Sequence, residues 1–159
     1  MNLADIPLPQ RDALTLMLEE HAKVKSLFKQ FGKEKDPEAR EALAHEACMT
    51  LTVIGKLEEE LFYPYVRSQN PAAFGRLLDK ALVEHACARN LIGQIQGMTA
   101  DDALFDASVT VLGEHISRHI EEEEGELFPK LIVHNIDLQD LAEQLQQRKD
   151  DITVQAHLV

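Results

Sequence analysis

One pattern occurs twice in this sequence, and the duplication restricts the folds open to the chain. The first copy reads LEEHAKVKSLF at 18–28 and LEEELFYP at 57–64, and the second reads LVEHACARNLI at 82–92 and HIEEEEGELFP at 119–129. His21 and His85 are 64 residues apart, and Pro64 and Pro129 are 65 apart. The chain therefore consists of two halves of similar length that carry the same landmarks, which is an internal repeat.

Apolar residues recur at three- and four-residue steps, and proline and glycine fall between the periodic runs. This spacing predicts four helices, at about 10–32, 37–64, 71–97 and 99–129. Asp36 and Asn70, each followed by proline, are typical helix N-caps, and Thr99 with Asp102 indicates a capping box. Pro64 either ends or kinks the second helix. The core stripe predicted for the fourth helix is Leu104, Ser108, Val111, Leu112, His115, His119 and Glu123.

Short connections between long helices make antiparallel neighbours, so the expected fold is all-α, an antiparallel up-down-up-down four-helix bundle. A weaker amphipathic segment, from Asp137 to about Asp150, predicts a short extra C-terminal helix laid against the bundle. With 159 residues the chain is expected to be a single domain over 1–159. The bundle would cover about 10–130, and a C-terminal extension would cover about 131–159.

Charge excludes several classes of partner. The net charge of -12 argues against nucleic acid and anionic membrane surfaces, because both require clustered Lys and Arg. No stretch approaches the length of a membrane span, and the first residues, MNLADIPLPQ, lack the features of a signal peptide. Two distant cysteines, Cys48 and Cys87, indicate buried thiols in a reducing compartment. The expected location is cytoplasmic.

The residues that carry chemistry are histidines and carboxylates on core stripes. His119 and Glu123 lie one helical turn apart on one face, and a buried carboxylate is costly unless it is paired or bound to a cation. His21 and His85 lie mid-stripe in the two repeats. Glu58 precedes Pro64 by six residues, as Glu123 precedes Pro129. A set of imidazoles and carboxylates from four helices suits iron, manganese or zinc.

These residues resemble the haemerythrin-like (HHE cation-binding) family, over nearly the whole bundle. The resemblance implies a four-helix bundle with His21, Glu58, His85, His119 and Glu123 as metal ligands. ELFYP at 60–64 and ELFP at 126–129 are similar to the family's helix ends. Such proteins hold a non-haem di-iron centre that serves dioxygen or nitric oxide binding, iron sensing or iron-sulfur repair.

Two departures from the family pattern stand out. Helices B and D of the family correspond to the predicted helices at 37–64 and 99–129. The helix B histidine of the family falls at Ile54, which cannot ligate a metal, and Arg89 stands where oxygen carriers have a second histidine. The resemblance then implies an extra open position, a single-metal site or no metal. Reversible dioxygen carriage is less expected than a sensing, redox or vestigial role.

Some assignments remain open at this point. Glu124 competes with Glu123 as the helix D carboxylate. His115 is either a replacement for the missing helix B nitrogen or a core histidine bonded to another side chain, and the second interpretation is favoured. His45, His134 and His157 are expected on the surface. Tyr63 and Tyr65 either line an entrance or simply pack, and packing is favoured.

The chain is expected to be a metal-binding haemerythrin-like protein that holds one or two ions. Iron is the expected metal, and another divalent metal is the alternative. It would bind or sense oxygen, nitric oxide or iron, with a small diatomic such as O2 or NO as partner; the resemblance leaves open whether it is an enzyme. The alternative is a degenerate, metal-free structural or regulatory module. A ferritin-like oxidase is disfavoured because no histidine has a glutamate three residues before it.

Overall fold

The computed structural model describes residues 2–157. Within that range the chain is helical, with no strand. The helices are α1 (Leu8–Lys33), α2 (Pro37–Leu57), α3 (Tyr63–Gln69), α4 (Pro71–Gln96), α5 (Phe105–Glu122), α6 (Phe128–Val133) and α7 (Gln139–His157), after a short 3-10 helix at Leu3–Asp5. Short π-helical turns, Glu58–Phe62 and Glu123–Leu127, join α2 to α3 and α5 to α6.

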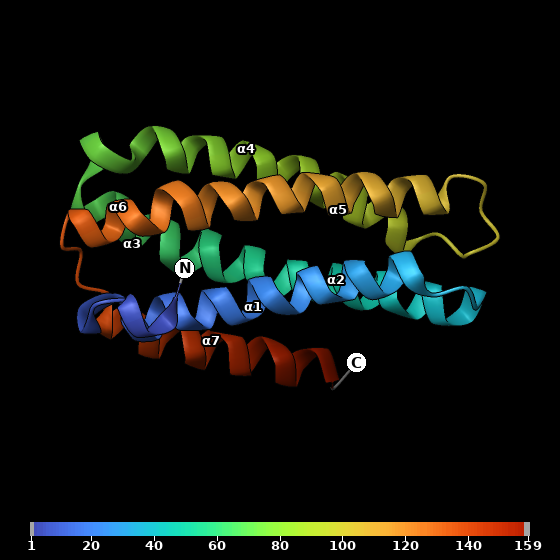
Figure 1. Ribbon diagram of the computed structural model, residues 1–159, viewed down its shortest axis with the longest axis horizontal. Coiled ribbons are helices and arrows are strands. Elements are labelled where there is room, and N and C mark those ends of the chain that lie inside the picture. The colour runs from blue at the N-terminus through green and yellow to red at the C-terminus, as the bar shows by residue number, and fades with distance from the viewer. Residues whose placement is uncertain (1, 158–159) are drawn as a thin grey trace.

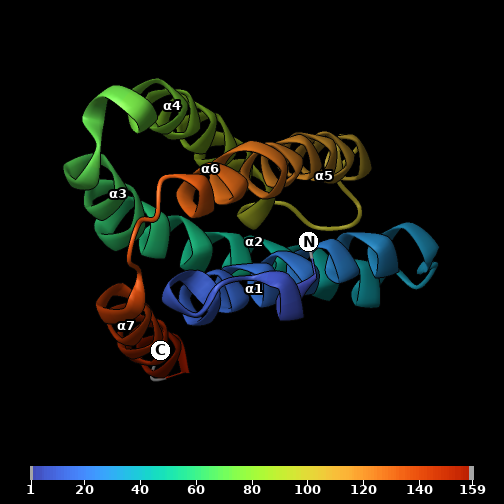
Figure 2. The same cartoon turned by 60° about the vertical axis from the view of Figure 1, so that its left-hand side comes forward.

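Four long helical rods lie side by side, and α7 lies outside them along α1 (Figures 1 and 2). The rods are α1, α2 with α3, α4, and α5 with α6. Successive rods run in opposite directions, as the short connections predicted. The expected all-α up-down-up-down bundle is therefore confirmed.

Local capping explains where two of the rods begin. The side chain of Asp36 accepts a hydrogen bond from the Ala39 N–H at 3.0 Å, and that of Asn70 accepts one from the Ala73 N–H at 3.1 Å. Each cap satisfies a main-chain donor that the first helical turn leaves free. Both helix starts were predicted from the sequence.

The predicted start of the fourth helix is wrong. The Thr99 N–H does bond the Asp102 carboxylate at 2.7 Å, but residues 97–104 form turns and α5 begins only at Phe105. The reason is burial: Phe105 is fully buried, whereas Leu104 is 66% exposed. The buried stripe of α5 follows from that register and differs at several positions from the predicted one: Phe105, Val109, Leu112, Ile116, His119 and Ile120.

The prolines do not end the rods. Pro64 and Pro129 lie in the first turns of α3 and α6, which continue from α2 and α5 through the π turns. Proline has no N–H and its ring excludes the carbonyl of an α-helical turn, so a wider turn lets the helix continue past it. The Tyr63 N–H bonds the Glu58 carbonyl, and the Phe128 N–H bonds the Glu123 carbonyl. The sequence repeat is thus also a repeat of backbone geometry.

The C-terminal helix is longer than predicted, since α7 spans 19 residues. It packs against the outside of α1 and α2, with Leu141 and Leu145 buried on the helix and Leu138 buried just before it. Near the middle of α7 the Lys149 ammonium pairs with the buried Glu20 carboxylate at 2.6 Å. These contacts leave the interior of the four rods to the functional residues.

Candidate metal centre

Four buried side chains from three rods converge in the interior of the bundle. Glu58, His85, His119 and Glu123 each offer one nitrogen or oxygen atom, and these atoms all lie within 4.8 Å of one another. His119 Nε2 lies 2.8 Å from a Glu123 oxygen, and His85 Nε2 lies 3.2 Å from a Glu58 oxygen. The two Nε2 atoms are 3.3 Å apart. Four of the five residues expected as ligands are therefore brought together.

His21, the fifth expected ligand, lies beside this group. Its Nε2 atom is 3.4 Å from the second oxygen of Glu123, and its Nδ1 atom bonds Glu124 at 2.8 Å. The His21 ring stacks on Phe128 with the planes 3° apart. Glu123 therefore turns inward between His21 and His119, and Glu124 holds His21 from outside.

Carboxylates also lie behind the other two imidazoles. His85 Nδ1 bonds Glu59 at 3.1 Å, and a Glu84 oxygen lies 3.6 Å from His119 Nδ1, somewhat beyond a hydrogen bond. Although partial burial opposes it, hydrogen bonds from His85 and Arg89 lower the pKa of Glu59. An ionised carboxylate can only accept, so the His85 hydrogen stays on Nδ1 and its Nε2 lone pair points into the group. This is the usual orientation of a metal-binding histidine.

Tyr63 was expected to pack, but the structure places its hydroxyl in the middle of the group. The hydroxyl lies within hydrogen-bond distance of both Glu58, at 3.0 Å, and Glu123, so its one hydrogen can be donated to either carboxylate, and it lies 3.3 and 3.4 Å from His85 Nε2 and His119 Nε2. Residues five apart on an α-helix point about 140° apart, but the π turn brings Tyr63 to the same side as Glu58. In the sequence, the sign of this π turn is Pro64, which follows the acidic residues at 58–60 within a helix that continues past it.

Neither residue that departs from the family pattern contributes a metal-binding atom to the group. Ile54 is buried one turn before Glu58, and the Arg89 guanidinium bonds both oxygens of Glu59 at 2.7 Å. His115 is half-buried and its Nε2 atom lies 3.1 Å from the main-chain carbonyl oxygen of Glu84. Its partner is thus a main-chain oxygen, not the side chain expected.

Burial and crowding of charge shift the titration of the metal-free group. Burial and the nearby Glu123 raise the pKa of Glu58 well above its usual range. Burial opposes ionisation of Glu123 too, but hydrogen bonds from Glu58, His119 and His21 hold its pKa well below the ordinary value. Although burial works against the charge, bonds with Glu123 and Glu124 raise the pKa of His21 to about 10. The two buried carboxyl groups thus need bound protons or nearby cations to offset their negative charge.

The geometry of the group suits a metal ion. Six of the short nitrogen and oxygen contacts within it, from 2.8 to 3.4 Å, are close to the separation of about 3.0 Å between neighbouring donors bound at about 2.1 Å and at right angles. One oxygen each of Glu58 and Glu123 is buried without a hydrogen-bond donor. A cation would satisfy both oxygens as well as the facing Nε2 lone pairs.

Fold and site together define a helical-bundle protein with a buried histidine and glutamate group able to bind a metal. Residues 12–131 match the family described as the Hemerythrin HHE cation binding domain. The chain belongs to this family. No curated protein matches the chain in sequence.

Its fold is similar to the crystal structure of a Hemerythrin HHE cation binding domain-containing protein from Mycobacterium kansasii. The TM-score is 0.74 at 19% sequence identity, over 91% of this chain and 88% of that one. At this identity the similarity concerns the fold. None of the helices within residues 2–157 combines the length and apolarity that a bilayer span demands.

Proposed function

We propose that this protein binds a single metal ion, with iron as the favoured metal, through Glu58, Tyr63, His85, His119 and Glu123. The observation that carries the proposal is the Tyr63 hydroxyl, which lies within 3.4 Å of both imidazole nitrogens and bonds both carboxylates. It supplies a donor from the same rod that lacks the family's histidine at Ile54. Three carboxylate or phenol oxygens and two imidazoles suit a hard, redox-active ion such as iron.

The place of His21 favours one ion over two. A second ion beside Glu123 would find His21 and the second Glu123 oxygen, but Ile54 brings no nitrogen from α2. Hydrogen bonding to Glu124 already occupies the other side of His21. We assign His21 the role of a cationic partner for Glu123 when one ion is bound.

A bound ion would supply a Lewis-acidic, redox-capable centre with a position left for a small ligand such as O2 or NO. The chain's own residues would prepare that position. Glu59 orients His85, and the apolar side chains around Ile54 limit access of water. The protein would then act in oxygen, nitric oxide or iron response in the cytoplasm.

A metal-free interaction module is the competing function. It is favoured by the bonds that Tyr63 and His21 make to the buried acids, since these bonds satisfy part of the group without any ion. Against it stand the unsatisfied oxygens of Glu58 and Glu123.

Elemental analysis of protein purified from iron-supplemented medium tests the proposal. We expect about one iron per chain, with visible absorption from phenolate bound to ferric iron. The substitution Tyr63→Phe should remove that absorption, whereas Tyr65→Phe should retain it, because the Tyr65 hydroxyl bonds the Asp137 carbonyl outside the group. Protein without metal after reconstitution would establish the metal-free module instead.

A further inference from the structure

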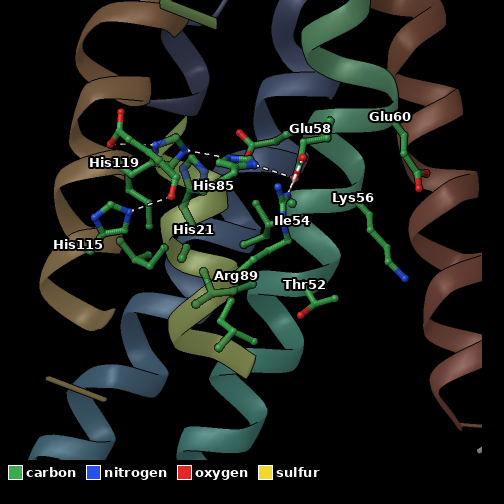
Figure 3. A pocket seen from close by; sticks show the side chains of 18 residues that line it. His21, Thr52, Ile54, Lys56, Glu58, Glu60, His85, Arg89, His115 and His119 are labelled. Carbon is green, nitrogen blue, oxygen red and sulfur yellow. Dashed lines mark hydrogen bonds and ion pairs between the residues drawn. The ribbon is translucent and has the colours of Figure 1, made fainter. Parts of the chain in front are cut away.

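A cavity of about 320 Å³ lies beside the histidine and glutamate group, between α2, α4 and α5 (Figure 3). Aliphatic side chains form most of its wall: Leu51, Ile54, Ala88, Ile92, Ile116 and Ile120. A cavity of about 150 Å³ in another protein holds benzene, so this one has room for a body of roughly ten non-hydrogen atoms. A diatomic molecule would leave most of this space unfilled.

The apolar character of the cavity follows from the sequence of α2. Ile54 stands one turn before Glu58 and turns its side chain toward the cavity (Figure 3). Wall residues keep a little exposure, 5% for Ile54 and 8% for Ile92, whereas Leu57, one turn further along the core, has none. The side chains thus leave a space at this level of the bundle that they fill at the next.

A polar acceptor lies at the inner end of the cavity. Glu58 lines it, and the Oε1 atom of Glu58 is buried, lies 3.2 Å from His85 Nε2 and makes no hydrogen bond. At the rim, Arg89 is already paired with Glu59, and Glu60 is paired with Arg148. Lys56 is the cation left at the exposed rim among the described lining residues, and an anionic head group that reached past it would meet Glu58 and Glu59, whereas a hydroxyl could donate to Glu58.

We propose that this cavity binds a neutral organic alcohol or phenol, with its hydrocarbon body against the aliphatic wall and its hydroxyl donating to Glu58 Oε1. The inference goes beyond the proposed function, because it names an organic ligand in place of a diatomic one. It rests on the wall and the unsatisfied acceptor, so binding does not require a metal. With metal bound, Glu58 Oε1 would face the ion, so the hydrogen bond to the hydroxyl belongs to the metal-free state while the apolar wall serves both states.

Calorimetric titration of 1-naphthol, a phenol of about eleven non-hydrogen atoms, into the full-length protein tests this site. Chelator-treated and iron-reconstituted protein are both titrated. We expect saturable binding of one molecule per chain in each state. In chelator-treated protein, naphthalene, which lacks the hydroxyl, should bind about tenfold more weakly than 1-naphthol, because it leaves Glu58 without a donor. Equal affinity for the two probes would overturn the role of Glu58.

Two identical substitutions on α4 locate the binding. Ala88 faces the cavity and Ala86 is exposed on the same helix. Ala88→Leu fills part of the space and should weaken 1-naphthol binding at least about tenfold, whereas Ala86→Leu should change it less than about twofold. Equal binding by both variants, or no binding by the natural protein, would overturn the inference.

Melting temperatures show whether both variants are folded, and Ile116→Phe gives a second way to fill the space if Ala88→Leu is unstable.

The test also separates the two proposals. Protein that binds 1-naphthol but no metal would refute the metal site and leave the cavity proposal standing. Protein that binds iron but neither probe would do the reverse.

Discussion

Phe128 holds in the second repeat the place that Tyr63 holds in the first. Each residue lies five positions after a buried glutamate and donates its main-chain N–H to that glutamate's carbonyl. The two differ by one hydroxyl, which in Tyr63 reaches the centre of the group, while the Phe128 ring stacks on His21. The repeat therefore creates two equivalent aromatic positions, and only one of them carries a donor.

Removal of that hydroxyl should weaken iron binding and lower the stability of the metal-free protein, while the packing of the ring is kept. Tyr63→Phe keeps the ring, so the fold should persist. The metal-free variant should lose about 1 to 3 kcal/mol of unfolding free energy, because Glu58 and Glu123 lose a buried donor. Its iron affinity should fall by more than about tenfold.

Urea denaturation of chelated protein and competition with a colorimetric chelator give the two quantities. Tyr65→Phe is the matched control, since its hydroxyl bonds a main-chain oxygen at the surface. If both tyrosine variants bind iron equally, Tyr63 is not part of the donor set.

A histidine in the group should matter far more for metal than one outside it. His119→Ala removes a nitrogen that lies 2.8 Å from Glu123, and metal affinity should fall by more than about 100-fold. His134→Ala, at an exposed position against Phe74, should leave metal content unchanged. His157, also expected at the surface, has a side chain outside the described residues. Comparable iron content in the His119 and His134 variants would contradict the site.

The core stripe of α4 and the histidine and glutamate positions were predictable, because mid-helix residues repeat at 3.6 per turn. Leu78, Ala81 and His85 are buried as that period requires. The position of Tyr63 was not predictable from it, since the period breaks in the π turn. Prediction of α5 failed at Leu104 for another reason: a cap pattern specifies where a helix can begin, whereas burial of Phe105 specifies where this one does.

The stability of the metal-free protein should fall as the pH rises. His21 has a pKa raised from 6.5 to about 10, so between these values the folded chain holds a proton that the unfolded chain releases. That stabilisation is complete below pH 6.5 and is lost as the pH approaches 10. The raised pKa of Glu58 contributes in the same direction, and the lowered pKa of Glu123 opposes it at acid pH.

Unfolding free energies of chelated protein at about pH 7 and about pH 9 measure this slope, which approaches about 1.4 kcal/mol per pH unit for one proton. Glu124→Gln removes one acidic partner of His21 and should flatten the slope. A slope that is unchanged in Glu124→Gln would show that this ion pair does not raise the pKa of His21.

The last prediction concerns Ile54, where a nitrogen donor is missing from α2. Ile54→His places an imidazole one turn before Glu58, at the wall of the cavity that His21 also lines. With metal, the added ligand should raise the iron content above that of the natural protein, toward two ions per chain. Without metal, a polar ring in an aliphatic wall should cost about 1 to 3 kcal/mol of unfolding free energy.

The two effects have opposite signs, so they can be separated by measuring melting temperature with and without chelator. Added iron should raise the melting temperature of Ile54→His more than that of the natural protein, because a ligand that binds only the folded state stabilises it by mass action. Ile54→Asn is a control, since its polar side chain disturbs the same wall with an amide in place of an imidazole. If Ile54→His and Ile54→Asn gain equally little from iron, the space beside Ile54 is not a vacant metal position and His21 serves only as the ionic partner of Glu123.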